Sequence, residues 1–179
     1  MDNTEGALLA TRHLISLGHR RIAFSGSLRL TDFRERLSGY HRALVQANLS
    51  PQRELEITNE ADWSFDAAVV LQRLQAAGAT AVVCATDAHA LTLVRRAPRE
   101  EIRIPEDLSV IGFDDVPAAG LSSPPLTTVH LPALTVGQMA VQKLMELLNG
   151  ADPAHCRSTL PVELRLRRST SPPGRPAAA

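Results

Sequence analysis

The stretch Leu108-Ser109-Val110-Ile111-Gly112-Phe113-Asp114-Asp115 decides the fold class of this chain. Its apolar run has the length of a strand and ends in two adjacent carboxylates, which is typical of a buried parallel strand with polar residues at its carboxyl end. Open α/β sheets bind their ligands at that end of their strands. We therefore expect the functional residues to lie near Asp114 and Asp115.

Segments with helical periodicity alternate with short β-rich runs on both sides of this strand. The further expected strands are 21–25, 55–58, 80–85, 126–131 and a last one in which Val162, Leu164 and Leu166 alternate with polar residues. Helices should begin near Asn3, Thr31, Ser64 and Asp87, and another should cover 134–148. This order predicts an α/β fold with a mostly parallel sheet and helices on both faces. Residues 171–179, rich in Pro and Ala, are expected to form a disordered tail.

The composition favours an aliphatic α/β core and excludes several other classes. The chain has 179 residues, of which 44% are apolar and 3% aromatic, enough for one core of ordinary size. Nineteen basic and nineteen acidic residues cancel, which disfavours nucleic-acid binding by this chain alone. Cys84 and Cys156 have no metal-ligand spacing, and no apolar run approaches membrane-spanning length. We expect a cytoplasmic protein with no metal, no cofactor and no membrane contact.

Polar side chains follow several of the predicted strands. The loops at the strand carboxyl ends hold Ser25-Gly26, Ala61-Asp62-Trp63, Thr86-Asp87 and Asp114-Asp115. Arg36, in the first turns of the helix after the first strand, can lean toward the same edge. This edge is a polar cluster with one indole, and no glycine-rich phosphate loop accompanies it.

Six motifs, in the same order along the chain, closely resemble the effector-binding region of LacI/GalR-type bacterial transcriptional regulators. They are DNTEGA at 2–7, LGHRRIA at 17–23, RLSGY at 36–40, TD at 86–87, IPEDLSVIGFDD at 104–115 and LTT at 126–128. Residues 160–165 and 168–170 are similar to the final strand of that family. The resemblance covers most of the chain.

The resemblance implies a periplasmic-binding-protein-like sensor domain over residues 1–170, made mainly of the C-terminal lobe plus a strand and a helix of the N-terminal lobe. Residues 1–125 and 158–170 would form this second lobe, and 126–149 would form the crossover strand and helix of the first lobe. The family's helix-turn-helix domain and half of the first lobe are expected to be absent from this chain. The helix at 133–148 would then have lost its native sheet, so its apolar stripe must be exposed, repacked on the second lobe or covered by another chain.

The resemblance assigns ligand contacts to Arg36, Trp63, Thr86 and Asp114. A guanidinium fork suits vicinal hydroxyls or a carboxylate, and an indole face suits the C–H face of a sugar ring. Asp114 matches an acidic residue that accepts hydrogen bonds from a sugar or a purine, whereas Thr86 stands where the family most often has Asn. Spacing alone favours a position for Arg36 on the solvent face of its helix, and the resemblance reverses that preference; Trp63 could equally fill the core.

Three further candidates for ligand contact are Asp2, Asn3 and Asp87. Asp87 is also suited to cap the helix that it begins. Asp115 is expected to stabilise the loop that follows it instead of touching a ligand.

The implied function is to bind a small-molecule effector, a sugar or a similar compound, and thereby to change DNA binding by a domain outside this chain. The helix at 88–97 resembles one that the family uses between subunits, which implies a homodimer. No catalysis is expected, and one lobe offers only half of a cleft, so effector affinity should be weak or absent.

Two other classes of function remain open from the residues alone. A sugar-binding protein of a transport system would share this fold. A magnesium-dependent α/β enzyme would use Asp87, Asp114 and Asp115 as an acidic cluster. Lys143, the only lysine, lies far along the sequence from these residues and supplies no phosphate contact beside them.

Overall fold

The computed structural model describes residues 2–59, 65–152, 156 and 158–174. Helices and strands alternate along nearly the whole chain, as the periodicity predicts. Their order is α1 (Asn3–Ser16), β1 (Ile22–Ser27), α2 (Thr31–Gln46), η1 (Arg53–Leu55), β2 (Glu56–Asn59), α3 (Ala67–Ala76), β3 (Ala81–Cys84), α4 (Asp87–Arg96), η2 (Ala97–Glu100), β4 (Ser109–Asp114), α5 (Pro117–Leu121), β5 (Thr127–His130), α6 (Ala133–Leu148) and β6 (Glu163–Arg165).

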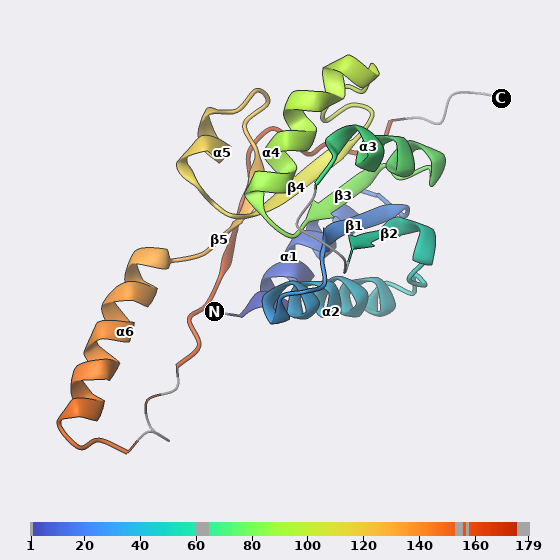
Figure 1. The fold of residues 1–179 in the computed structure, drawn as a ribbon. Coiled ribbons are helices and arrows are strands. Elements are labelled where there is room, and N and C mark those ends of the chain that lie inside the picture. Colours follow the sequence, from blue (N-terminus) through green and yellow to red (C-terminus); the bar gives the residue numbers. More distant parts are fainter. Residues whose placement is uncertain (1, 60–64, 153–155, 157, 175–179) are drawn as a thin grey trace.

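The strands form one sheet in the order β2-β1-β3-β4-β5-β6 (Figure 1). Strands β1 to β5 are parallel, and β6 pairs with β5 in the antiparallel direction. The chain moves outward from β1 to β2 and then returns past β1 to β3, so the order reverses beside β1. The predicted mostly parallel α/β sheet is confirmed, and its carboxyl edge is where ligands bind in such folds.

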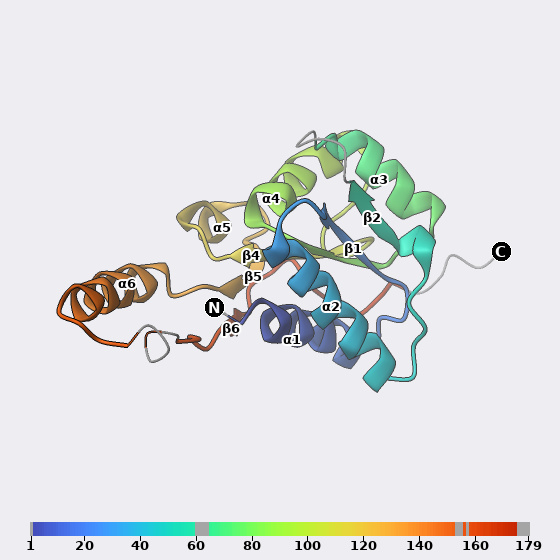
Figure 2. The same ribbon diagram turned by 60° about the horizontal axis from the view of Figure 1, so that its bottom comes forward.

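Helices cover both faces of the sheet, with α1 and α2 on one side and α3 and α4 on the other (Figure 2). The core under α1 and α2 contains the rings of Phe24, Tyr40 and Phe113. The core under α3 and α4 is aliphatic and includes Val82 and Val110. Successive strand residues alternate between these two cores, as a sheet buried on both faces requires.

From the sequence, Asn3 or Thr4, Ser64 and Asp87 are suited to cap the helices that begin near them, and the structure places these caps on other residues. Asp2, not Asn3, caps α1 by accepting the amide of Glu5 at 2.8 Å. Thr86, not Asp87, caps α4, with its hydroxyl oxygen 3.3 Å from the amide nitrogen of His89. Asp66 caps α3, while the predicted cap Ser64 lies outside the described residues.

The strand Thr127–His130 belongs to the same sheet as the rest of the chain, where it pairs with β4. The expectation that this strand forms part of a separate first lobe is therefore wrong, because backbone pairing with β4 continues the parallel ladder. Helix α6 extends away from the sheet (Figure 1), and none of its residues is buried. Leu134 is 77% exposed and Leu148 is 71% exposed. Repacking of its apolar stripe on the sheet is therefore not observed, and cover by another chain stays a prediction.

The end of the described chain packs against the amino-terminal ends of β4 and β5. Ser169 is buried, donates to the carbonyl of Val110 at 2.6 Å and accepts the amide of Thr127 at 2.8 Å. Ser171 exchanges hydrogen bonds with Ser109. The prediction of disorder from residue 171 onward is thus wrong for 171–174. Leu166, expected on a buried face, is 62% exposed because β6 has already ended.

None of the helices in the described ranges combines the length and the apolar character needed to span a bilayer.

Candidate effector-binding edge

The candidate site is the carboxyl edge of the sheet, where the ends of β3, β4 and β5 meet the first turns of α1 and α2. Ala85 and Thr86 follow β3 and lead to Asp87 at the start of α4, while Asp114 ends β4 and Asp115 follows it. The structure therefore brings together residues that are far apart in the sequence, as predicted from the parallel order of the strands.

Arg36 is a buried cation with four kinds of partner. Its side chain is only 4% exposed and its Nη1 lies 3.6 Å from Oδ1 of Asp114. The same nitrogen donates to the carbonyl of Ala85, and the guanidinium carbon lies 3.7 Å from the centre of the Phe113 ring. Burial lowers the pKa of Arg36, and Asp114 is the first of several carboxylates that oppose this effect. The solvent-facing alternative for Arg36 is excluded.

Asn3, the first residue of α1, connects that helix to Arg36 and Glu35 on α2. Its amide oxygen accepts from Nε of Arg36 at 3.0 Å, and its amide nitrogen donates to Glu35 at 2.8 Å. Asn3 is buried, so both halves of its amide are satisfied by the protein, as burial demands. Asn3 and Asp2 thus have local structural roles at the start of α1, and their contact with a ligand stays a prediction.

Among the carboxylates of Asp87, Asp114 and Asp115, that of Asp114 is the most exposed to solvent. Its side chain is 33% exposed, and burial of the remainder raises its pKa to about 6 despite the opposing charge of Arg36. Its backbone has a φ of +120°, and that of Asp115 has a φ of +60°. Residues other than glycine rarely adopt a positive φ, so the backbone of the turn after β4 has an unusual conformation.

Asp87 points away from the edge and into the protein. Its side chain is fully buried and accepts the hydroxyl of Thr128 at 2.6 Å and the amide of Val116 at 2.9 Å. Burial raises the pKa of Asp87, and these hydrogen bonds oppose that shift. Direct ligand contact by Asp87 would require it to give up those bonds.

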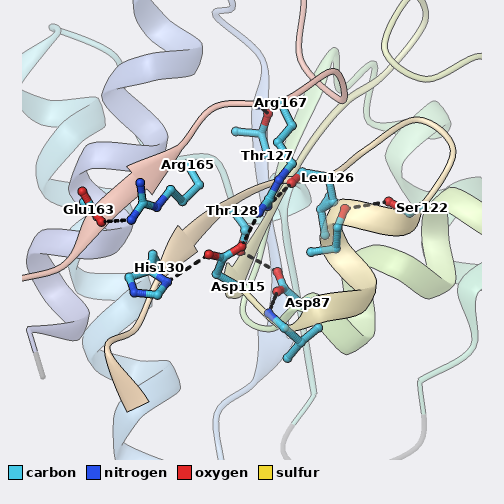
Figure 3. A network of polar contacts seen from close by, with 12 residues as sticks. Asp87, Asp115, Ser122, Leu126, Thr127, Thr128, His130, Glu163, Arg165 and Arg167 are labelled. Carbon is cyan, nitrogen blue, oxygen red and sulfur yellow. Dashed lines mark hydrogen bonds and ion pairs between the residues drawn. The ribbon is translucent and has the colours of Figure 1, made fainter. Parts of the chain in front are cut away.

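Asp115 joins three segments at the far side of the turn (Figure 3). One oxygen lies 2.6 Å from Nη2 of Arg167, and the other lies 2.9 Å from Nδ1 of His130. Burial opposes ionisation of Asp115, but the hydrogen bonds from these partners hold its pKa below the usual value. The loop-stabilising role predicted for Asp115 agrees with these contacts.

The three carboxylates do not converge on one point. Asp87 faces Thr128, Asp114 faces Arg36, and Asp115 faces Arg167 and His130. Within the described ranges no three His, Cys, Asp or Glu side chains are placed to share a metal ion. This geometry gives no support to the magnesium-enzyme alternative.

Trp63, a predicted stacking residue, lies outside the described residues.

Sequence reasoning missed two features of the site. Phe113 supports the cation of Arg36, and nothing in the motif distinguishes this ring from an ordinary core residue. Gly112 leaves space for Asp87, and a glycine inside a strand is a known sign of such close approach.

The sequence pattern of the family described as "Periplasmic binding protein-like domain" matches residues 11–170. Among curated proteins, the HTH-type transcriptional repressor PurR of Vibrio atlanticus is 43% identical over 157 residues, which are 85% of this chain and 46% of that protein. The chain spans about half the length of the curated relatives it matches.

Solved structures agree with the family in fold. The transcriptional regulator CelR in complex with cellobiose superposes with a TM-score of 0.86 at 32% identity, over 94% of this chain and 52% of that one. A sugar-binding transcriptional regulator of the LacI family from Escherichia coli, complexed with phosphate, superposes with a TM-score of 0.84 at 30% identity, over 97% of this chain and 63% of that one.

Proposed function

Because this chain belongs to the periplasmic binding protein-like domain family, as an effector-binding domain of the LacI/GalR type, we propose that it binds a small polyhydroxylated effector at the carboxyl edge of its sheet. A sugar or a sugar-like molecule is the proposed ligand class. Binding at this edge would be coupled to the activity of a transcriptional regulator, with no chemical conversion of the ligand.

The single observation that carries the proposal is the pairing of buried Arg36 with half-buried Asp114 at 3.6 Å on this edge. A cation placed beneath an acceptor fixes that acceptor and offsets its charge. The result is a wall with a directed hydrogen-bond acceptor and little net charge. Such a wall suits a neutral ligand that donates hydroxyl hydrogens, whereas an anionic ligand would face the carboxylate.

The other residues have complementary roles in the proposal. Asp114 accepts from ligand hydroxyls. The hydroxyl of Thr86, whose oxygen already accepts from the helix α4 amide of His89, donates to a ligand oxygen. Trp63 offers an indole face to the sugar ring. Arg36 acts mainly by holding Asp114 and the carbonyl of Ala85 in place.

We propose a sugar in preference to a purine because two solved structures with this fold are a cellobiose complex and a sugar-binding regulator. We extend the proposal to the regulator as a whole. It would act as a homodimer through the face of α4, in the cytoplasm, and would bind DNA through a helix-turn-helix domain that is not among the described residues.

Saturation-transfer NMR on the 179-residue chain tests the ligand class, since it detects weak binding. Separate samples would contain D-ribose, cellobiose, adenine and glucose 6-phosphate. We expect transfer to at least one of the neutral sugars, and its loss in Asp114→Asn but not in Asp107→Asn, whose side chain pairs with Arg103 away from the edge. Transfer to adenine or to the phosphate ester alone would overturn the sugar assignment, and equal loss in both variants would overturn the role of Asp114.

A further inference from the structure

The carboxylate of Asp87 lies where three separate segments of the chain meet (Figure 3). Asp87 is the first residue of α4, shortly after the end of β3 at Cys84. One oxygen accepts the hydroxyl of Thr128 on β5 at 2.6 Å, and the other accepts the amide of Val116, in the loop after β4, at 2.9 Å. A single buried carboxylate therefore ties together the start of α4, the loop after β4 and strand β5.

Strand β4 is shaped to admit this carboxylate. A Cβ atom added at Gly112 would lie 2.1 Å from Oδ1 of Asp87, far inside van der Waals contact. Because Gly112 has no side chain, Oδ1 of Asp87 can lie beside it and accept the hydroxyl of Thr128. Three of the sequence motifs, at 86–87, 112–115 and 127–128, thus meet at one pair of oxygen atoms.

The turn that follows β4 needs such a restraint. Asp114 and Asp115 have φ angles of +120° and +60°, and conformations of this kind cost about 1–3 kcal/mol for each non-glycine residue. They persist only where surrounding contacts fix them. The bond from the amide of Val116 to Asp87 comes directly after these two residues, and Asp115 is held on its other side by Arg167 and His130.

We propose that Asp87 is a positioning residue of the effector site: its buried carboxylate holds the turn at 114–116 so that Asp114 faces Arg36 and the edge of the sheet. The inference rests on the proposed function for the role of Asp114 toward a ligand. The restraint on the turn is a property of the ligand-free protein and is tested without any ligand.

Two substitutions displace the Asp87 carboxylate without changing any charge. Thr128→Val removes the hydroxyl that binds Oδ1 and keeps the shape of the side chain. Gly112→Ala places a methyl group in the space of Oδ1. Thr127→Val is the matched control, because Thr127 is also buried on β5 but its hydroxyl accepts the amide of Arg167 instead.

The measurement is carboxyl-detected NMR titration of Asp114, together with the Cα and Cβ chemical shifts of Asp114 and Asp115. In Thr128→Val the relaxed turn exposes Asp114, so its pKa falls from about 6 by about one unit or more toward the ordinary value. The Cα and Cβ chemical shifts of Asp114 and Asp115 move away from the values typical of a positive φ. The control Thr127→Val leaves both signals unchanged.

Unchanged signals in folded Thr128→Val, or equal changes in Thr127→Val, would overturn the positioning role of Asp87. If Gly112→Ala does not fold, Thr128→Val alone decides. Because no ligand is present, a negative result here leaves the sugar-binding proposal standing, and a failed sugar screen does not alter the outcome for the turn.

Discussion

The guanidinium carbon of Arg36 lies 3.7 Å from the centre of the Phe113 ring. A cation over the face of an aromatic ring is stabilised by the ring's negative potential, and more so away from water. This contact lets helix α2 place a buried charge at the end of β4, beneath Asp114. The same residue therefore serves the stability of the fold and the shape of the candidate site.

Replacing Arg36 by methionine keeps much of its apolar stem but removes every donor. The carbonyl of Ala85 and the amide oxygen of Asn3 lose their partner, so we expect the free energy of unfolding to fall by about 2–3 kcal/mol. Urea denaturation measures this loss. Arg42→Met, exposed on the same helix, should change the unfolding free energy far less, and a similar loss in both variants would contradict a special role for Arg36.

Asp114 should make stability depend on pH between 4 and 7. Burial raises the pKa of Asp114 to about 6, above the value of about 3.9 expected in the unfolded chain. The folded state therefore binds this proton more tightly, and the resulting stabilisation is full below pH 4 and is lost as the pH rises through the folded pKa. The Asp114→Asn variant has no carboxyl group at this position, so it does not lose this stabilisation as the pH rises.

The stability difference between Asp114→Asn and the wild type should accordingly shift in favour of the variant by about 1–2 kcal/mol between pH 4 and pH 7, after allowance for solvent screening. Chemical denaturation of both proteins across this range provides the comparison. A difference that does not vary with pH would show that the carboxyl of Asp114 titrates normally.

Ser169 fixes the last segment of the described chain to the sheet. Ser169→Ala removes the donor to Val110 and the acceptor of the Thr127 amide, both buried, and should lower the free energy of unfolding by about 2–3 kcal/mol. Ser50→Ala, on an exposed loop, is the control. Equal unfolding temperatures for the two variants in thermal denaturation would contradict this role of Ser169.

Helix α6 contributes exposed apolar surface without contributing to the core. Replacing Leu134, Val141 and Leu148 together by glutamine should therefore leave the unfolding temperature nearly unchanged, while binding of a hydrophobic dye falls. Dye fluorescence and calorimetry on the same samples measure the two effects. A large drop in the unfolding temperature would mean that α6 packs on the sheet in solution.

The sequence predicts the alternating elements well because hydrophobic periodicity sets them locally. It does not choose between neighbouring caps such as Thr86 and Asp87, since both side chains can accept an amide. In the structure Thr86 keeps an extended backbone and the helix begins at Asp87, so Thr86 is the cap. Helix α5, Pro117–Leu121, is too short to show a period. The insertion of Ser169 beside Val110 depends on contacts between residues far apart in the chain.

For the site, the parallel order of the strands was enough to place Arg36, Thr86 and Asp114 on one edge. The partners of these residues could not be predicted in the same way. That Asn3 bridges Arg36 and Glu35 depends on how α1 packs against α2. There, Gly39 allows a close approach, because a Cβ atom added to it would lie 2.0 Å from the carbonyl oxygen of Thr4.

The most direct test of the central claim is to map, by protein-detected NMR, where a neutral sugar such as cellobiose binds on the 179-residue chain. We expect weak binding, with the largest chemical-shift changes at Arg36, Thr86 and Asp114 and with small changes on α6. Changes confined to other surfaces would contradict it. So would the absence of any change at Arg36 and Asp114 at high concentrations of both D-ribose and cellobiose.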